Sequence, residues 1–218
     1  MSENPKTIVE QAYDHIADFY LTWAEGHKTP REGYTEKVLA AVPTKSSPHI
    51  LELGCGPGVP ITRMLLDRGA RVTANDISTK QIALAKARCP EATYAPGDMT
   101  ALAFEDGEFD GATCFYAIFH LPRAEQKGML EKVFGWLKPG AVFVFNFPKG
   151  QDHEEIHGEM MGHGMFWSSF DVEETKEMVQ DVGFEIVEAE VLEAGDGKLK
   201  EDDLDYGVTF VWLAVRKP

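Results

Sequence analysis

The sequence has few cysteines and no long apolar run. Its three cysteines, Cys55, Cys89 and Cys114, show neither the paired spacing of a disulfide framework nor that of a thiolate metal site. No apolar stretch is long enough to span a bilayer, and the acidic, polar start of the chain lacks the basic flank of a signal peptide. These absences predict a protein of the reducing cytoplasm with no membrane partner.

Positive charge is also scarce. The chain has 36 Asp and Glu against 21 Lys and Arg, a formal net charge of -15. A field of this sign repels phosphate backbones, so we expect no nucleic-acid partner. With 218 residues, of which 44% are hydrophobic, the chain fits one domain over 1–218, as a monomer or homodimer. The acidic stretch 193–205 is expected to be a solvated loop between strands.

Apolar periodicity divides the chain into helices and strands. Two helical stretches are expected within 5–42, ahead of the first strand. The expected strands cover 49–54, 71–76, 93–98, 109–116, 141–147, 184–192 and 207–215. Helical patterns separate most of these strands, so the fold class is α/β with a mainly parallel sheet. The last two strands are joined by a loop without a helical pattern, and we expect them to pair antiparallel at the sheet edge.

A glycine-rich turn follows the first expected strand. The segment ELGCGPG (52–58) places glycine at 54, 56 and 58, where a strand meets a helix. Glycine lets backbone approach a ligand closely or adopt a positive φ. The dinucleotide fingerprint needs its third glycine at the position of Val59, so a nicotinamide oxidoreductase is a disfavoured alternative.

Two acids end the next two strands. Asp76 can accept hydrogen bonds from both hydroxyls of a ribose. Asp98 can accept from an adenine amine, while Met99 offers a backbone N–H and an apolar face. Each acid alone is better explained as a turn or helix cap. Three consecutive strand ends bearing Gly, Asp and Asp in this order predict a ligand that contains a nucleoside.

These motifs carry a resemblance to a known family. ELGCGPG, ANDIS (74–78), GDM (97–99), FDGATCFYAIFHL (109–121) and LKPGAVFVFNF (137–147) resemble class I S-adenosylmethionine (SAM)-dependent methyltransferases, over about residues 8–217. The small-molecule branch, with ubiquinone and menaquinone methyltransferases, is the most similar. The resemblance implies a Rossmann-like, seven-stranded, mostly parallel sheet with helices on both faces and a C-terminal antiparallel hairpin. It also implies SAM as cofactor.

The resemblance further implies a set of cofactor-binding residues. Around the methionine part of SAM it places Glu52, Gly54, Gly56 and Gly58. Asp76 and Ile77 fall at the ribose, Asp98 and Met99 at the adenine, and backbone near Phe115 closes over the cofactor. Tyr13 or Tyr20 would cover it from a helical lid over 1–45.

The methyl acceptor is expected beyond the strand at 109–116. His120 follows this strand and could be a base for a hydroxyl acceptor, or a packed residue with a locally bonded ring. The long connection 149–170 is expected to be a lid over a small-molecule substrate. Its candidate substrate residues are His153, His157, Met161, Met165 and Trp167. Each apolar one could equally be ordinary core packing.

One motif in this lid points elsewhere. Residues 153–157 read HEEIH, the HExxH pattern of zinc proteases, and His163 falls where a third ligand can stand. The pattern needs a helix that presents both imidazoles on one face, and no apolar helical stripe precedes it. We therefore expect no metal, and a metalloprotease is a disfavoured alternative.

The sequence as a whole predicts a methyltransferase that transfers a methyl group to an O or N atom of a small molecule. An alternative keeps the fold and SAM binding but not methylation, in a protein that catalyses a rearrangement or acts as a partner subunit. The complete glycine turn and both strand-end acids favour a working SAM site, and analysis of the reaction products would distinguish the two functions.

Overall fold

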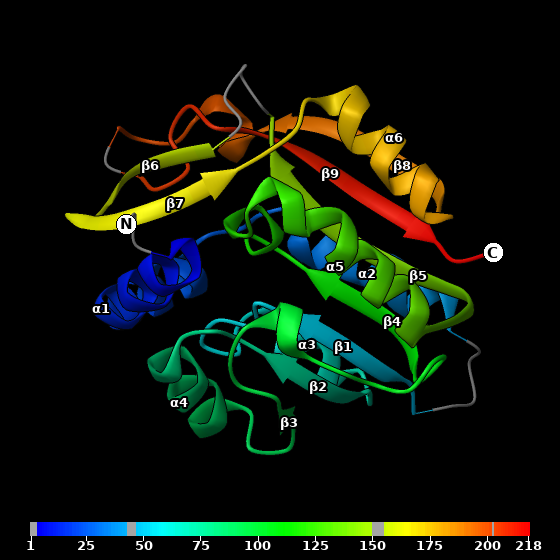
Figure 1. Cartoon of the computed structure of the whole chain (residues 1–218). Helices are drawn as coiled ribbons and strands as arrows, with labels where there is room; N and C mark the ends of the chain where they lie inside the picture. The colour runs from blue at the N-terminus through cyan, green and yellow to red at the C-terminus, as the bar shows by residue number, and fades with distance from the viewer. Residues whose placement is uncertain (1–3, 43–46, 150–154, 202) are drawn as a thin grey trace.

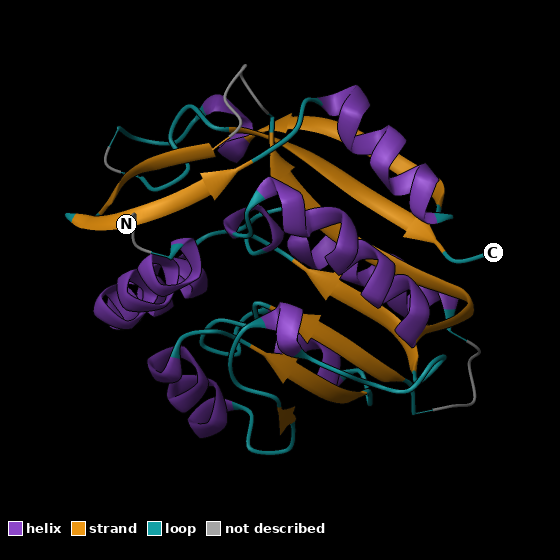
Figure 2. Cartoon of the chain, viewed as in Figure 1, coloured by secondary structure: helices purple, strands orange, loops and turns teal. Residues whose placement is uncertain are grey.

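The computed structural model describes residues 4–42, 47–149, 155–201 and 203–218. A seven-stranded sheet with strand order β3-β2-β1-β4-β5-β9-β8 forms its centre (Figures 1 and 2). Its strands are β1 (His49–Leu53), β2 (Arg71–Asn75), β3 (Thr93–Tyr94), β4 (Phe109–Cys114), β5 (Leu137–Pro148), β8 (Glu185–Glu193) and β9 (Thr209–Arg216). Strands β1 to β5 pair parallel, whereas β9 pairs antiparallel with both β5 and β8. The predicted α/β fold and antiparallel ending are confirmed.

Helices cover both faces of this sheet. They are α1 (Pro5–Gly26), α2 (Arg31–Ala41), α3 (Ile61–Asp67), α4 (Thr79–Arg88), α5 (Arg123–Trp136) and α6 (Val172–Val182), with short 3-10 turns η1 (Met99–Ala101), η2 (Ile118–His120) and η3 (Ala194–Gly197). Helices α5 and α6 lie on the near face in Figure 1, and α2 packs behind the sheet. Helix α6 begins with a capping box, in which Asp171 accepts from the Glu174 N–H at 2.8 Å.

Close packing of α2 against β4 depends on Gly111. A Cβ at Gly111 would lie 2.4 Å from Cγ1 of Val38, which is fully buried in α2. The missing side chain therefore lets the helix approach the strand. The centre of the sheet is correspondingly apolar, and most residues of β1, β4 and β5 are buried, as expected for parallel strands covered on both faces.

Strand β3 is shorter than predicted. The sequence pattern extends to residue 98, but only Thr93 and Tyr94 pair with β2. The Asn75 side-chain amide donates to the carbonyls of Ala95 (2.7 Å) and Gly97 (2.8 Å), so the chain leaves the sheet here. Backbone hydrogen bonds from Ala95 N to Ala74 O and from Gly97 N to Asp76 O, both 2.9 Å, hold this segment beside the tip of β2.

The connection after β5 contains an antiparallel hairpin rather than a plain loop. Its strands are β6 (Glu155–Met160) and β7 (His163–Ser168). The two-residue turn consists of Met161 (φ 56°) and Gly162 (φ 76°), the positive-φ pair that tight hairpins favour. Periodicity missed the hairpin because a non-glycine residue seldom takes such a φ.

The hairpin and the N-terminal helix pack on each other. Val9 and Ala12 of α1 form a small core with Met165 and Phe166 of β7. In Figure 1, α1 lies between this hairpin and α4, beyond the carboxyl ends of β1 and β2. On the other side, the Asp14 carboxylate of α1 accepts from Ser78 Oγ at the start of α4. None of the helices in the described ranges has the length and apolar character that a membrane crossing requires.

Candidate functional site

The glycine turn places three positive-φ residues at the tip of β1. Gly54 (φ 69°) and Gly56 (φ 54°) face a cavity, and a Cβ on Gly56 would lie 3.4 Å from the Tyr20 ring. Gly58 (φ 82°) does not line this cavity, because its α-carbon faces Ala85 and Cys89, where a Cβ would lie 3.1 to 3.3 Å from their nearest atoms. Gly58 therefore packs the turn onto α4.

Asp76 ties the tip of β2 to the glycine turn. Its carboxylate accepts backbone hydrogen bonds from Gly56 N (2.8 Å) and Ser78 N (2.9 Å). Burial raises the pKa of Asp76 to about 6, although both backbone hydrogen bonds oppose the rise. Each oxygen still has a lone pair for a ligand hydroxyl, so this buried acid can act as an acceptor pair inside the cavity.

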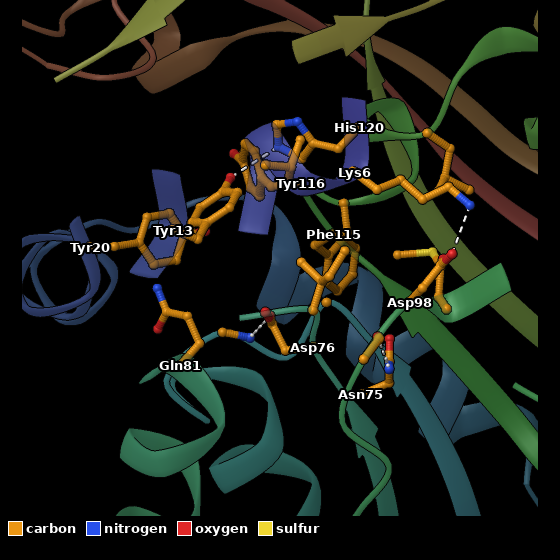
Figure 3. A pocket seen from close by; sticks show the side chains of 18 residues that line it. Lys6, Tyr13, Tyr20, Asn75, Asp76, Gln81, Asp98, Phe115, Tyr116 and His120 are labelled. Carbon is orange, nitrogen blue, oxygen red and sulfur yellow. Dashed lines mark hydrogen bonds and ion pairs between the residues drawn. The ribbon is translucent and has the colours of Figure 1, made fainter. Parts of the chain in front are cut away.

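We call this space the glycine-turn cavity (Figure 3). It is lined by α1, by the turn at 54–56, by 75–81, by 97–99 and by 115–121. Ten of the predicted site residues line it: Tyr13, Tyr20, Gly54, Gly56, Asp76, Ile77, Asp98, Met99, Phe115 and His120. Nine of these were assigned to the cofactor, so residues far apart in the sequence meet around one space.

Glu52 lies beneath the turn rather than in the cavity lining. Its Oε2 accepts a hydrogen bond from Thr62 Oγ1 of α3 at 2.6 Å. Burial raises the pKa of Glu52 to about 8, even though this hydrogen bond lowers it. The described contacts give Glu52 a role in supporting the turn, and its predicted contact with the methionine part of a cofactor stays a prediction.

The buried Glu52 carboxyl makes stability depend on pH. Its pKa is about 8 in the folded protein against 4.5 for the ordinary group, so the stabilisation is complete below pH 4.5 and is lost as pH rises towards 8. Glu52→Gln keeps an acceptor for Thr62 and removes the titration. We expect the free energy of unfolding of wild type, relative to this variant, to fall by about 1.5 kcal/mol between pH 6.5 and 8 in urea titrations. A difference that stays constant over this range contradicts the prediction.

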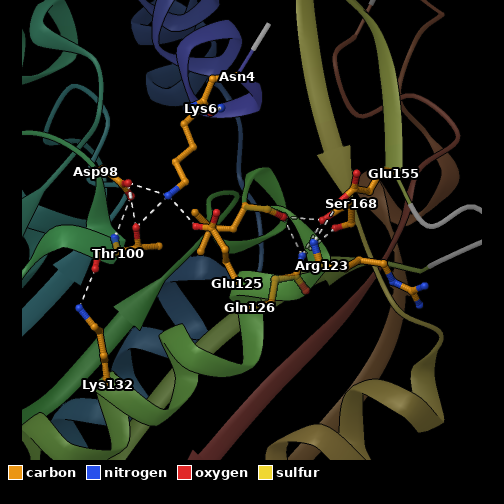
Figure 4. A network of polar contacts seen from close by, with 11 residues as sticks. Asn4, Lys6, Asp98, Thr100, Arg123, Glu125, Gln126, Lys132, Glu155 and Ser168 are labelled. Carbon is orange, nitrogen blue, oxygen red and sulfur yellow. Dashed lines mark hydrogen bonds and ion pairs between the residues drawn. The ribbon is translucent and has the colours of Figure 1, made fainter. Parts of the chain in front are cut away.

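The second predicted acid, Asp98, already has partners. Lys6 Nζ of α1 donates to its Oδ2 at 2.7 Å, while Thr100 N donates to its Oδ1 at 2.8 Å (Figure 4). Partial burial raises the pKa of Asp98, but the hydrogen bonds from Lys6 and Thr100 outweigh it and lower the pKa overall. Lys6 also pairs with Glu125 of α5. The first turn of α1 is thereby fixed across one end of the cavity.

Unpartnered polar atoms mark the floor of the same cavity. Gln81 is 1% exposed, and neither its amide nitrogen nor its amide oxygen has a hydrogen-bond partner in the described structure. Oδ1 of Asn75 is likewise buried without a partner. Both side chains line the cavity (Figure 3), and a Cβ at Gly97 would point into open space there. Buried amides of this kind are costly unless a polar ligand satisfies them.

His120 and Tyr13 form a buried pair at the upper wall of the cavity. Nδ1 of His120 lies 2.7 Å from the Phe166 carbonyl oxygen, which can only accept, so Nδ1 carries the proton. Nε2 therefore accepts from the Tyr13 hydroxyl at 3.0 Å. Burial lowers the pKa of His120 to about 4. The imidazole is neutral at physiological pH and holds the Tyr13 hydroxyl in place.

A second, wider space adjoins the first, and we call it the hairpin cavity. It measures about 810 Å³ and is lined by α1, by 116–120, by the β6–β7 hairpin and by 203–210. Of the predicted substrate residues, Met161 and Trp167 line it. Met165 is 1% exposed in the small core against α1, and His157 contacts the Phe166 ring from an exposed position on β6. His153 lies outside the described residues.

The stretch 193–205 is not simply a solvated loop. Asp205 is only 8% exposed, and both Asp203 and Asp205 line the hairpin cavity. The expectation is wrong for these two acids because the segment folds back against α1, where His27 and Trp23 donate to Asp203. Acidic composition alone does not reveal such long-range partners.

The HExxH pattern has no helix in the described residues. Glu155, Ile156 and His157 belong to strand β6, whereas His153 and Glu154 lie outside the described ranges. His163 begins β7 and stacks on His15 of α1, with ring centroids 4.6 Å apart. Within the described parts of the chain, no group of three or more His, Cys, Asp or Glu side chains could hold a metal ion.

Comparisons with known proteins agree with this geometry. A family model described as a methyltransferase domain matches residues 50–140. A trans-aconitate 2-methyltransferase of Paracidovorax citrulli is 34% identical over 127 residues, which cover 57% of this chain and 47% of that protein. The 24-methylenesterol C-methyltransferase 2 of Oryza sativa subsp. japonica is 24% identical over 214 residues, 85% of this chain and 58% of that protein.

The chain thus spans about half the length of these curated relatives. Among solved structures, the 4+2 cyclase SpnF has the same fold with a TM-score of 0.72 and 17% identity, covering 100% of this chain and 98% of the cyclase. The matched segment 50–140 contains the strand tips that build the glycine-turn cavity. Residues 50–140 therefore match a methyltransferase domain, and the chain is similar in sequence and fold to SAM-dependent methyltransferases, whose cofactor is SAM.

Proposed function

We propose that this protein transfers the methyl group of SAM to an oxygen or nitrogen atom of a small molecule held in the hairpin cavity. The observation that carries the proposal is the wall between the two cavities. Tyr13, Tyr20, Tyr116 and His120 line both spaces. A cofactor on one side and an acceptor on the other would therefore meet at these four side chains.

The residues of the glycine-turn cavity fit SAM. Asp76 has free lone pairs for ribose hydroxyls, and the unpartnered amides of Gln81 and Asn75 need a polar ligand. Gly56 and Gly97 leave room where a Cβ would intrude. We assign the adenine to the end near Asp98 and Met99, where Lys6 already shares the Asp98 carboxylate.

When bound, SAM supplies a methyl group activated by a sulfonium. The protein's part is to align the acceptor with that methyl group and to exclude water. Tyr20 and Tyr116 are each 9% exposed and His120 is 6% exposed, so the meeting point is largely dry. His120 stays our candidate to receive a proton from a hydroxyl acceptor, and because its unprotonated Nε2 binds the Tyr13 hydroxyl, Tyr13 would relay that proton. The pKa of His120, about 4, makes it a weak base, so alignment of the acceptor with the methyl group contributes more to the rate acceleration than proton transfer does.

The segments 1–45 and 149–170 are proposed as lids over the cofactor and the acceptor. Their support is the joint packing of α1 and β7 over the two cavities. Cys55, Cys89 and Cys114 are buried free thiols, which fits the cytoplasmic location expected from the sequence.

One experiment separates methyl transfer from the alternative. Purified protein is incubated with SAM and a panel of small hydroxyl and amine compounds, and products are analysed by mass spectrometry. Gain of one methyl together with formation of S-adenosylhomocysteine is the expected result. SAM binding without methyl gain across the panel would favour a non-methylating reaction. The fold that this chain shares with a 4+2 cyclase is compatible with that alternative.

Gln81 provides a test of the cofactor site. Gln81→Met keeps the side-chain length and removes both unpartnered polar atoms. One or two lost hydrogen bonds to the cofactor correspond to a rise in the Kd for SAM of about five- to tenfold in isothermal titration. Gln180→Met on the exposed side of α6 is the matched control and should bind normally. Equal affinities of the two variants would refute a contact between Gln81 and SAM.

A further inference from the structure

The hairpin cavity combines aromatic walls with negative charge. Seven of its lining residues are aromatic, among them Tyr116, Phe119, Trp167 and Phe210. Its acids are Glu159, Asp203 and Asp205, whereas Lys149 is the sole Lys or Arg in the lining that the structure describes. The cavity therefore offers several rings and carboxylates but little to bind an anion.

Asp205 is the acid best placed to receive a ligand. Asp203 is already contacted by the His27 imidazole, and its Oδ1 accepts from the Asp205 N–H at 3.0 Å. The Asp205 carboxylate accepts from the Tyr116 hydroxyl. Among the described residues, no cationic side chain lies within ion-pairing distance of it. Tyr116 also lines both cavities, so Asp205 is adjacent to the place where methyl transfer would occur.

Burial makes this carboxylate costly when charged. Burial, with a smaller contribution from the negative charge of Asp203, raises the pKa of Asp205 to about 6, although the Tyr116 hydrogen bond opposes the rise. At pH 7 and above the group is ionised inside a largely aromatic space. Arg31 acts on it only from a distance, since its guanidinium lies over the rings of Trp23 and Tyr116 at 5.6 and 5.4 Å. A cation placed in the cavity would relieve the buried charge.

We propose that the hairpin cavity recognises a methyl acceptor that carries a cationic amine or ammonium group, held by Asp205 against the aromatic wall, and that it disfavours carboxylate acceptors. Aromatic rings with a carboxylate are the surroundings in which proteins bind ammonium groups. The formal net charge of -15 acts in the same direction at long range, because it attracts cations and repels anions. This inference narrows the acceptor of the proposed methyl transfer and rests on that function.

Three probes of nearly equal shape test the charge preference. They are choline, its neutral isostere 3,3-dimethyl-1-butanol, and the anion 3,3-dimethylbutanoate. Each is titrated into the full chain in the presence of saturating S-adenosylhomocysteine, and binding is followed by ligand-observed NMR and calorimetry. We expect choline to bind about tenfold more tightly than the alcohol, and the anion to bind most weakly. Equal binding of all three, or tightest binding of the anion, overturns the proposal.

The substitution Asp205→Asn tests whether this one side chain causes the preference for choline over its neutral isostere. The variant keeps the shape of Asp205 and should lose most of the tenfold preference for choline while binding the neutral alcohol as before. Asp196→Asn is the matched control, because it removes the same charge from the same acidic stretch at an exposed residue outside the cavity lining. Retention of the full preference in Asp205→Asn would overturn the assignment. The wild-type series does not depend on how either variant folds.

Failure of this inference can be told apart from failure of the proposed function. Binding of S-adenosylhomocysteine is measured first, in the absence of any probe. If it binds and choline shows no advantage, the amine-binding inference is wrong while the cofactor site stands. If it does not bind but choline keeps its advantage in wild type and loses it in Asp205→Asn, the methyltransferase proposal fails and the cation site is supported.

Discussion

Asp76→Asn is expected to raise the Kd for SAM about a hundredfold. Asp76 is buried at the tip of β2, and its two oxygens already organise the backbone N–H groups of Gly56 and Ser78. In the proposed complex the same oxygens accept both ribose hydroxyls, and hydrogen bonds to a charged group contribute about 1.5–3 kcal/mol each. An amide has one oxygen fewer and places N–H donors against donors, so two of these interactions weaken together.

Isothermal titration with SAM and with adenosine distinguishes this role from a general disturbance. Adenosine retains the ribose but lacks the amino-acid part, so Asp76→Asn should weaken both ligands. Asp67→Asn, which removes a carboxylate from the exposed end of α3, is the matched control and should bind like wild type. A variant that loses SAM but keeps adenosine binding would show that Asp76 does not hold the sugar.

Local sequence carried the prediction of the cofactor side of the site. The glycine turn and Asp76 each follow a strand directly, Asp98 lies shortly after β3, and the carboxyl ends of adjacent parallel strands must meet. The fold class and the antiparallel ending could also be predicted from local sequence. Buried strands and amphipathic helices each produce a characteristic spacing of apolar residues within a short segment.

The residues that were missed depend on partners far away in the chain. In the sequence, Lys6 is an ordinary polar residue of a helical stretch. Only the folded structure places it beside Asp98, which is 92 residues later in the chain. Gln81 looks like any polar residue of a first helical turn, and only burial inside the cavity makes its amide notable. Asp205 sits in an acidic stretch typical of solvent-exposed loops, and its burial against Tyr116 follows from the packing of 203–210 on α1.

Gly54→Ala is expected to destabilise the protein by about 4 kcal/mol. Gly54 has φ of +69°, a conformation that costs an L residue about 1–2 kcal/mol. In addition, the new Cβ would lie 2.3 Å from Cβ of Ala117, so the glycine turn and the chain after β4 must move apart. Overpacking of this kind costs up to about 3 kcal/mol. Urea unfolding of the variant and of wild type measures the sum.

A double-mutant cycle separates the clash from the backbone cost. Ala117→Gly removes the opposing Cβ, so the pair Gly54→Ala with Ala117→Gly should show a favourable coupling of about 2–3 kcal/mol relative to the two single variants. Gly69→Ala is the control, because Gly69 has φ of +81° with no atom within 4 Å of the added Cβ, and it should cost only about 1–2 kcal/mol. Absence of coupling at 54 and 117 would mean that the two Cβ positions are not in contact. In that case the tips of β1 and β4 would not be as close as their joint lining of the glycine-turn cavity requires.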